Sequence, residues 1–304
     1  MAAITFWACR SRTGCDQSPS KDFANFFEEI WLPAANQKHL PAMTALFVAL
    51  CLTLGTWAIL RGGFAVAGGR SLKVIGYDPN AIGLGALAII VAIYYYGWQY
   101  GLALVLSVVI HEYGHVVAYR VCGHDDARFR LIPIMGGVAI SNRIPADQQN
   151  AFFIALMGPA ICLAPMGLCF ALSDLLISTF YPAAEFLGIL GLILGFFNFF
   201  NLLPFWPLDG GRIVQILAQT FLPGATRQVS IAMIVIGAAL AFLTHSYIIL
   251  FFILISWGGL MQSEKLLEIQ RPMTKSRALL ALAAYVFTAG AFYLGGAQVL
   301  GGLL

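Results

Sequence analysis

The chain is organised around Val108-Val109-Ile110-His111-Glu112-Tyr113-Gly114-His115-Val116-Val117-Ala118-Tyr119, which sets a His-Glu-x-x-His pattern inside an otherwise apolar run. On an α-helix, His111 and His115 lie one turn apart on the same face, where two imidazoles can bind one Zn²⁺. Glu112 lies beside them and can polarise a water molecule at the metal. This spacing predicts a zinc site with the chemistry of a hydrolase.

The composition places this pattern in a membrane. Hydrophobic residues make up 60% of the 304 residues and charged residues only 10%, whereas about a quarter of a soluble domain is charged. We therefore expect an integral, multi-pass protein embedded in the lipid bilayer, where ionisable groups within a span mark a functional site. The net charge of +3 is too small to predict nucleic-acid binding. The six cysteines have no paired metal-type spacing and imply no disulfide framework.

Apolar segments predict an all-α polytopic fold with about eight transmembrane helices and a short re-entrant β-hairpin or loop near the active site. A span needs about 20 mostly apolar residues. Such segments lie at roughly 41–60, 81–98, 101–120, 150–172, 183–203, 229–244, 246–261 and 278–299. The pair around His245 could instead be one broken helix, and the Gly-rich segment 61–80 could partly re-enter the membrane.

These segments predict four regions of the chain. They are an N-terminal tail (1–40), N-terminal transmembrane helices (41–98), a catalytic membrane core (99–225) and C-terminal transmembrane helices (226–304). The tail is polar by the standard of this protein. It is either an interfacial helix or lid, or an unstructured segment.

Lysine and arginine residues outside the tail gather on one side of the predicted spans. They are Arg61, Arg70, Lys73, Arg120, Arg128, Arg130, Arg143, Arg212, Arg227, Lys265, Arg271, Lys275 and Arg277. Basic loops tend to face the cytoplasm, so both termini are predicted outside, and a bacterial inner membrane is the expected location. His111 precedes Arg120 by nine residues, or about 13 Å of helix. The metal would therefore lie inside the bilayer, nearer its cytoplasmic side.

Two segments that follow the pattern are candidates for further parts of the site. The polar turn 122–126 contains His124 and two aspartates, which are either a second ligand group or, as we expect, a solvated loop. The apolar stretch Leu131–Ile140 is too short to span and has Gly136-Gly137 at its centre, which favours a re-entrant hairpin or loop. One of its strands could pair with an unwound substrate segment; plain packing against the helices is the alternative.

The two histidines need a third protein ligand, because a zinc ion that activates water usually has three. Asp209 is the best candidate. It follows two prolines that interrupt the fifth span and precedes a Gly-Gly pair, where backbones can approach closely. Taken alone, Asp209 would most simply be the N-cap of a helix over Ile213–Leu222.

Two motifs together resemble the site-2 protease family of intramembrane zinc metalloproteases, peptidase family M50. One is His111-Glu112-x-x-His115 on a membrane helix. The other is Asn201-Leu-Leu-Pro204-x-x-Pro207-Leu-Asp209-Gly210-Gly-Arg, two spans later. The Gly136-Gly137 loop and Gly158-Pro159-Ala160 are also similar to the family's pattern, so the resemblance covers roughly 100–225.

The resemblance implies a role for each residue of the motifs. It implies His111, His115 and Asp209 as Zn²⁺ ligands, Glu112 as general base, and Asn201 as a contact to the oxyanion or to the substrate backbone. The implied reaction is hydrolysis of a peptide bond within or next to the transmembrane segment of a single-span membrane protein. The implied setting is regulated intramembrane proteolysis.

The chain departs from the family pattern at two points. Many members carry an Asn after Gly158-Pro159-Ala160, where this chain has Ile161-Cys162. Stretches outside the spans reach only about 40 residues, too few for the peptide-binding PDZ or nucleotide-binding CBS module that some members add. Substrate choice is therefore expected to rest on the membrane core, the 1–40 tail or a regulatory membrane partner.

Two functions from other classes compete with proteolysis. A transporter or ion-binding protein could relay protons through His111, Glu112 and Asp209, but the His-Glu motif has no counterpart in the second half, as inverted repeats would require. A membrane scaffold that binds transmembrane partners without cutting them does not need a base, and Glu112 argues against it.

Overall fold

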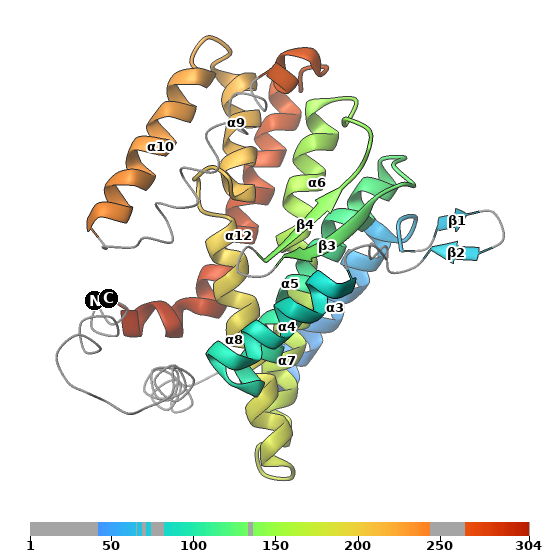
Figure 1. Cartoon of the computed structure of the whole chain (residues 1–304), viewed down its shortest axis with the longest axis vertical. Coiled ribbons are helices and arrows are strands. Elements are labelled where there is room, and N and C mark those ends of the chain that lie inside the picture. Colours follow the sequence, from blue (N-terminus) through green and yellow to red (C-terminus); the bar gives the residue numbers. More distant parts are fainter. Residues whose placement is uncertain are drawn as a thin grey trace.

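The protein is mostly helical in the ranges that the computed structural model describes, which are 42–64, 66–68, 71–73, 82–132, 136–243 and 265–303. Figure 1 shows the elements, which are α3 (Ala42–Leu60), β1 (Val66–Gly68), β2 (Ser71–Lys73), α4 (Ile82–Tyr96), α5 (Trp98–Val121), β3 (Arg128–Ile132), β4 (Gly136–Ile140), α6 (Gln148–Ile161), α7 (Leu163–Leu176), α8 (Tyr181–Asn201), α9 (Asp209–Phe221), α10 (Thr226–Leu243) and α12 (Lys275–Leu303).

Five helical segments in these ranges are long and apolar enough to cross a membrane. They are Met43–Leu60, Trp98–Val121, Gln148–Leu176, Tyr181–Asn201 and Lys275–Gly295. The polytopic helical fold predicted from the sequence is confirmed at this level, whereas the count of eight is not. α4 has only 15 residues, or about 22 Å of helix against the roughly 30 Å of a hydrocarbon core, and the apolar part of α10 is also short. The predicted tail 1–40 and span 246–261 lie outside the described residues.

The fourth predicted span is a broken helix, as its Gly-Pro sequence indicates. α6 ends at Ile161 and α7 begins at Leu163. At the break, the backbone N–H of Cys162 bonds to the carbonyl of Pro159 at 2.9 Å, which tightens the turn. A proline inside a helix weakens the regular hydrogen-bond ladder. On either side of the break, α6 contacts α5 and α9, whereas α7 contacts α3 and α8.

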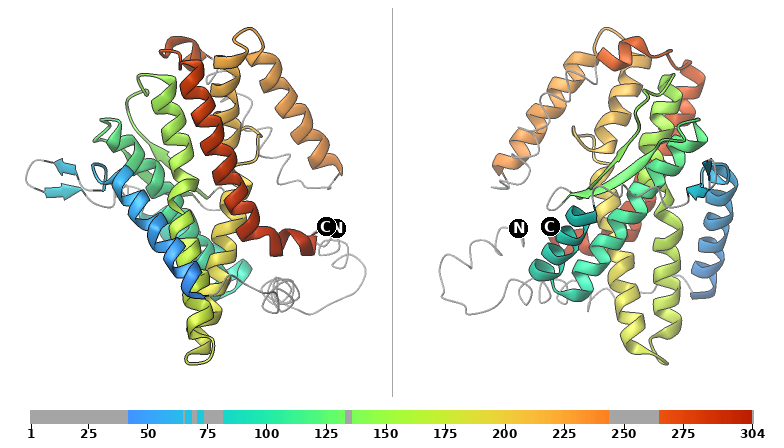
Figure 2. Two further views of the ribbon diagram at one scale, coloured as in Figure 1. Left: turned by 180° about the vertical axis from the view of Figure 1, so that it is seen from behind. Right: turned by 45° about the vertical axis from the view of Figure 1, so that its right-hand side comes forward.

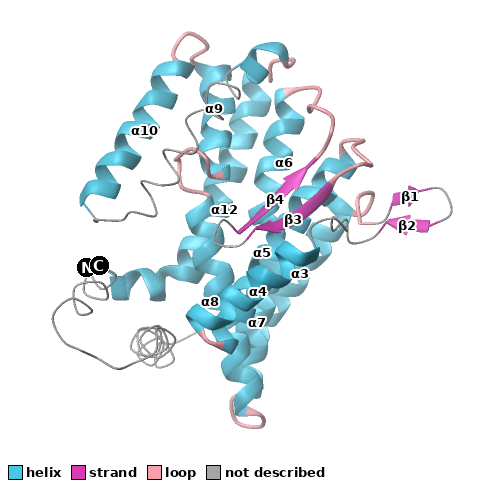
Figure 3. Cartoon of the chain, viewed as in Figure 1, coloured by secondary structure: helices cyan, strands magenta, loops and turns pink. Residues whose placement is uncertain are grey.

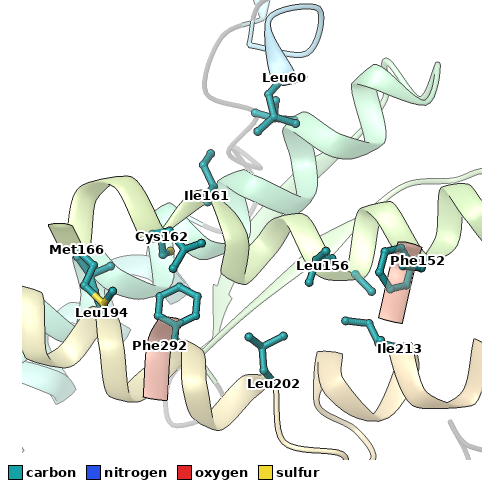
Figure 4. Close-up of a cluster of buried hydrophobic side chains, with 14 of the residues drawn as sticks. Leu60, Phe152, Leu156, Ile161, Cys162, Met166, Leu194, Leu202, Ile213 and Phe292 are labelled. Atoms are coloured by element: carbon teal, nitrogen blue, oxygen red, sulfur yellow. The ribbon is translucent and has the colours of Figure 1, made fainter. Parts of the chain in front are cut away.

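α5 is the centre of the molecule, in contact with α4, α6 and α8, while α7 packs between α3 and α8 (Figure 1). α12 runs along one side and contacts both α8 and α9 (Figure 2). Figure 4 shows part of the resulting core, with side chains of the broken span facing Leu194 and Leu202 on one side and Phe292 of α12 nearby. Tyr285 of α12 also donates a 2.6 Å hydrogen bond to the carbonyl of Leu202, directly after α8.

The segment predicted as a hairpin or loop is an antiparallel pair of strands. Arg128 pairs with Ile140 and Ile132 with Gly136, and Figure 3 shows β3 and β4 lying across the helices. β4 contacts α5 directly. In the Gly-rich segment 61–80, β1 and β2 form a second short antiparallel pair.

A polar network in the turn after α5 holds the base of the β3–β4 hairpin. Nδ1 of His124 lies 2.9 Å from the hydroxyl of Ser141, and the backbone N–H of Asn142 donates to Asp126 Oδ2 at 2.6 Å. The prediction of a simply solvated loop is therefore wrong for His124, which is only 5% exposed. Burial lowers the pKa of His124 below its ordinary value, outweighing the opposing effect of Asp126.

Candidate metal centre

Three side chains from two helices converge on one point. His111 and His115 come from consecutive turns of α5, and Asp209 is the first residue of α9. The Asp209 Oδ2 atom lies 3.1 Å from His111 Nε2 and 3.2 Å from His115 Nε2, and the two Nε2 atoms are 3.1 Å apart. The reading of Asp209 as an N-cap does not hold, because Leu208 occupies the N-cap position.

The other ring nitrogen of each histidine faces a hydrogen-bond acceptor. Nδ1 of His115 donates to the carbonyl of Ile154 at 2.7 Å, and Nδ1 of His111 donates to Oδ1 of Asn198 at 2.8 Å. The amide nitrogen of Asn198 donates to the carbonyl of Leu194 at 2.8 Å. This bond leaves the side-chain oxygen of Asn198 facing His111. These bonds place the proton on Nδ1 in both rings and leave each Nε2 with a free lone pair.

The cluster therefore brings together three atoms that can accept a hydrogen bond but cannot donate one. Two imidazole lone pairs and one carboxylate oxygen face one another in a site where the side chains are 4%, 9% and 12% exposed, and buried acceptors require a shared donor or cation. Bonds of about 2.0 Å to a tetrahedral zinc ion imply ligand separations of about 3.3 Å. The separations of 3.1 to 3.2 Å fit this value, so the residues suit a divalent metal of zinc's size and preference.

Glu112 is held beside the cluster by the hairpin. Its carboxylate accepts a hydrogen bond from the backbone N–H of Ala139 in β4, and the residue is only 6% exposed. A Cβ atom at Gly137 would lie 2.3 Å from Cγ of Glu112, so only glycine permits this close approach of strand and side chain. The hairpin thereby orients the carboxylate predicted to act as the base.

Gly158, in the Gly-Pro-Ala motif of α6, allows a similarly close approach of His115. A Cβ atom there would lie 2.2 Å from Nε2 of His115. The His115 ring occupies the space that a larger residue at this position of α6 would fill. His115 is thereby within reach of the carbonyl of Ile154, which is also on α6.

The structure separates the two asparagines near the end of α8. Asn201, the predicted catalytic contact, is the last residue of α8, and its amide donates to the carbonyl of Phe197 at 3.1 Å. Asn198, which our sequence analysis did not single out, is fully buried and bonds to His111. Cys162, just after Gly158-Pro159-Ala160, hydrogen-bonds to the same Asn198 side chain. A polar amide in an apolar span was the available signal for Asn198.

Comparison with known proteins finds similarity to one family around Asp209. The model of peptidase family M50 matches residues 171–244, which include Asp209 and its flanking motif. A zinc metalloprotease of Methanocaldococcus jannaschii is 35% identical over 119 residues, covering 37% of this chain and 32% of that protein. This part of the chain is similar to peptidase family M50. The stage IV sporulation protein FB of Bacillus subtilis is similar at 29% identity over 130 residues, covering 40% of this chain and 41% of that protein.

The M50 likeness is confined to part of each relative, since the chain spans about a third of the length of the first relatives it matches. Among solved structures, the site-2 protease from Methanocaldococcus jannaschii matches with a TM-score of 0.38 and 22% identity, covering 66% of this chain and 95% of that one.

Proposed function

We propose that this protein is a member of peptidase family M50, a zinc-dependent intramembrane metalloendopeptidase that hydrolyses a peptide bond within or next to a transmembrane segment. The observation that carries the proposal is the buried cluster of His111, His115 and Asp209, in which both Nδ1 atoms are engaged and the three remaining atoms all accept. The zinc metalloprotease named among the relatives supports the choice of metal and reaction.

Each side chain has a separate task in this proposal. His111, His115 and Asp209 hold the zinc ion, which when bound lowers the pKa of a water ligand toward neutrality and polarises a carbonyl. Glu112, held by Ala139, accepts the proton of the attacking water and passes it to the leaving amine. Asn201 donates its amide to the substrate backbone or the developing oxyanion after leaving its bond to Phe197.

The proposal also includes the arrangement of the protein in the membrane. We propose about eight spans, with basic loops on the cytoplasmic face of a bacterial inner membrane and the metal nearer that face. The substrate is a single-span membrane protein cleaved in regulated intramembrane proteolysis. Helical peptide bonds have occupied carbonyls, so the substrate must unwind locally, and a regulatory membrane partner can control this step.

Cleavage of a panel of single-span proteins by the purified protein in lipid, with metal analysis alongside, tests the function. The wild-type protein should carry zinc and cleave a subset of the panel, whereas Glu112→Gln should keep zinc and lose cleavage. Equal cleavage by Glu112→Gln would remove this residue from the mechanism. A zinc-loaded wild-type protein that moves ions across a vesicle membrane and cuts nothing would favour the transporter instead.

A further inference from the structure

A pocket of about 180 Å³ lies beside the metal cluster and combines two arginines with an apolar wall. Arg143 comes from the loop after β4 and Arg212 from the first turn of α9. Tyr119 of α5, Ala151 of α6 and several aliphatic side chains complete the wall. We call this cavity the arginine pocket.

The arginine pocket lies one helical turn from the metal cluster. His115 is followed four residues later on α5 by Tyr119, and Asp209 is followed three residues later on α9 by Arg212. On α6, which runs the other way, the Ile154 carbonyl that holds His115 is preceded by Ala151. Three of the elements that build the cluster therefore continue into the pocket, about 5 Å further along each helix.

The charged side chains that line the pocket are both positive. Two guanidinium groups line it, and its lining residues within the described part of the chain include no acid. Arg143 uses one donor for the carbonyl of Gly123 at 3.4 Å and lies near Asp126, but a guanidinium carries five donors. Arg212 is exposed at the pocket.

A second observation points to a ligand with its own N–H group. Gln270 lines the pocket and is 9% exposed. Its amide nitrogen donates to the carbonyl of Pro145 at 2.9 Å, while its buried Oε1 atom has no hydrogen-bond partner in the described structure. A buried acceptor without a partner is unusual in a native protein, and a turn of the Gln270 side chain toward the pocket would let this oxygen accept a backbone N–H from an extended peptide.

We propose that the arginine pocket is a substrate subsite that binds an aspartate or glutamate side chain close to the scissile bond. The inference rests on the proposed proteolytic function. An extended chain advances about 3.3 Å per residue, so a side chain two or three residues from the bond being cut reaches a pocket one helical turn from the metal. Arg143 and Arg212 bind its carboxylate, and Gln270 accepts a backbone N–H.

The test uses one single-span substrate with a mapped cleavage site. Asp, Asn or Lys is placed in turn at each of the three positions on either side of the cut. At one or two of these positions, Asp should exceed its isostere Asn by about tenfold in kcat/KM, mainly through KM, because charge-assisted hydrogen bonds are lost. Lys at the same position should be cleaved still more slowly.

Replacing each arginine by glutamate distinguishes recognition of substrate charge from a structural role of the arginines. Arg143→Glu and Arg212→Glu should each abolish the preference for Asp and improve cleavage of the Lys substrate relative to the Asp substrate. Arg227→Glu, on α10 and outside the pocket, is the matched control and should leave the preference unchanged. Gln270→Leu should weaken binding of every substrate in the series without altering the preference for charge.

Failure of the subsite and failure of the proteolytic function give different results. Binding of the same substrates to the Glu112→Gln variant measures the preference without turnover. Binding or cleavage that ignores charge at all six positions overturns the subsite and leaves the protease intact. An Arg143- and Arg212-dependent response to phosphatidylglycerol in the surrounding bilayer, with no response to substrate charge, would assign the pocket to a lipid headgroup and also overturn the proposal.

Discussion

Asn198→Leu should weaken zinc binding although Asn198 does not belong to the proposed ligand set. The substitution removes the oxygen that accepts from Nδ1 of His111 at 2.8 Å, and it leaves that N–H without a partner in a site where His111 is 3% exposed. Leaving a buried donor unpaired costs about 1–3 kcal/mol, which corresponds to roughly 5- to 150-fold in affinity. This agrees with the 10- to 100-fold typical of residues that orient a metal-bound histidine.

The assay is zinc competition against a chelator of known affinity, with the purified variants in the same lipid. Asn201→Leu is the matched control, since Asn201 lies three residues later on α8 and its side chain donates to the carbonyl of Phe197, whereas Asn198 accepts from His111. It should keep wild-type zinc affinity while cleaving more slowly. Asn198→Asp, which retains an acceptor oxygen, should bind zinc much better than Asn198→Leu.

Thermal unfolding of the zinc-free variants separates positioning from folding, because Asn198 also bonds to Leu194 and Cys162. Asn198→Leu is expected to lose more stability in the zinc-loaded state than in the zinc-free state. Wild-type zinc affinity in Asn198→Leu would refute the reasoning, since Nδ1 of His111 would then need no buried acceptor to orient the ring.

Three further predictions follow from close contacts and from the hairpin network. Gly158→Ala places a methyl group 2.2 Å from Nε2 of His115; it should lower zinc affinity and destabilise the protein by about 1–3 kcal/mol, as measured by chelator competition and thermal unfolding. Gly137→Ala, with its clash at Glu112 instead, should reduce cleavage while zinc stays bound; equal zinc loss in both variants would contradict the separate roles of the two glycines. His124 has a pKa lowered by burial, so its contribution to stability is complete above the ordinary value of about 6.5 and declines as the pH falls below it. Hydrogen exchange of β4 in zinc-free protein should therefore lose protection between pH 7 and pH 5.5, and this loss should be smaller in His124→Gln.

The convergence of the three side chains of the metal cluster was predictable, because it follows from residue types and their spacing in the sequence. His111 and His115 are one helical turn apart wherever that helix lies, and Asp209 stands out as a carboxylate between helix-interrupting prolines and a Gly-Gly pair. The broken fourth span was predictable for a similar reason, since Pro159 acts locally on its own helix.

The supports of the cluster could not be predicted because they depend on how helices face one another. The partner of His115 is a main-chain carbonyl, which every residue possesses, and only the packing of α6 on α5 selects Ile154. Asn198 differs from Asn201 by less than one helical turn, so the rotation of α8 decides which amide reaches His111. Hydropathy also did not predict that α4 would have only 15 residues.

The shared metal is tested most directly by X-ray absorption at the zinc edge on protein loaded with zinc, together with the zinc content of each chain. One zinc ion per chain is predicted, bound by two imidazole nitrogens and by oxygen ligands at about 2.0 Å, and lost or reduced in His111→Gln, His115→Gln and Asp209→Ala. Sulfur ligands, or full zinc content with an unchanged spectrum in all three variants, would contradict the claim that these side chains hold one ion.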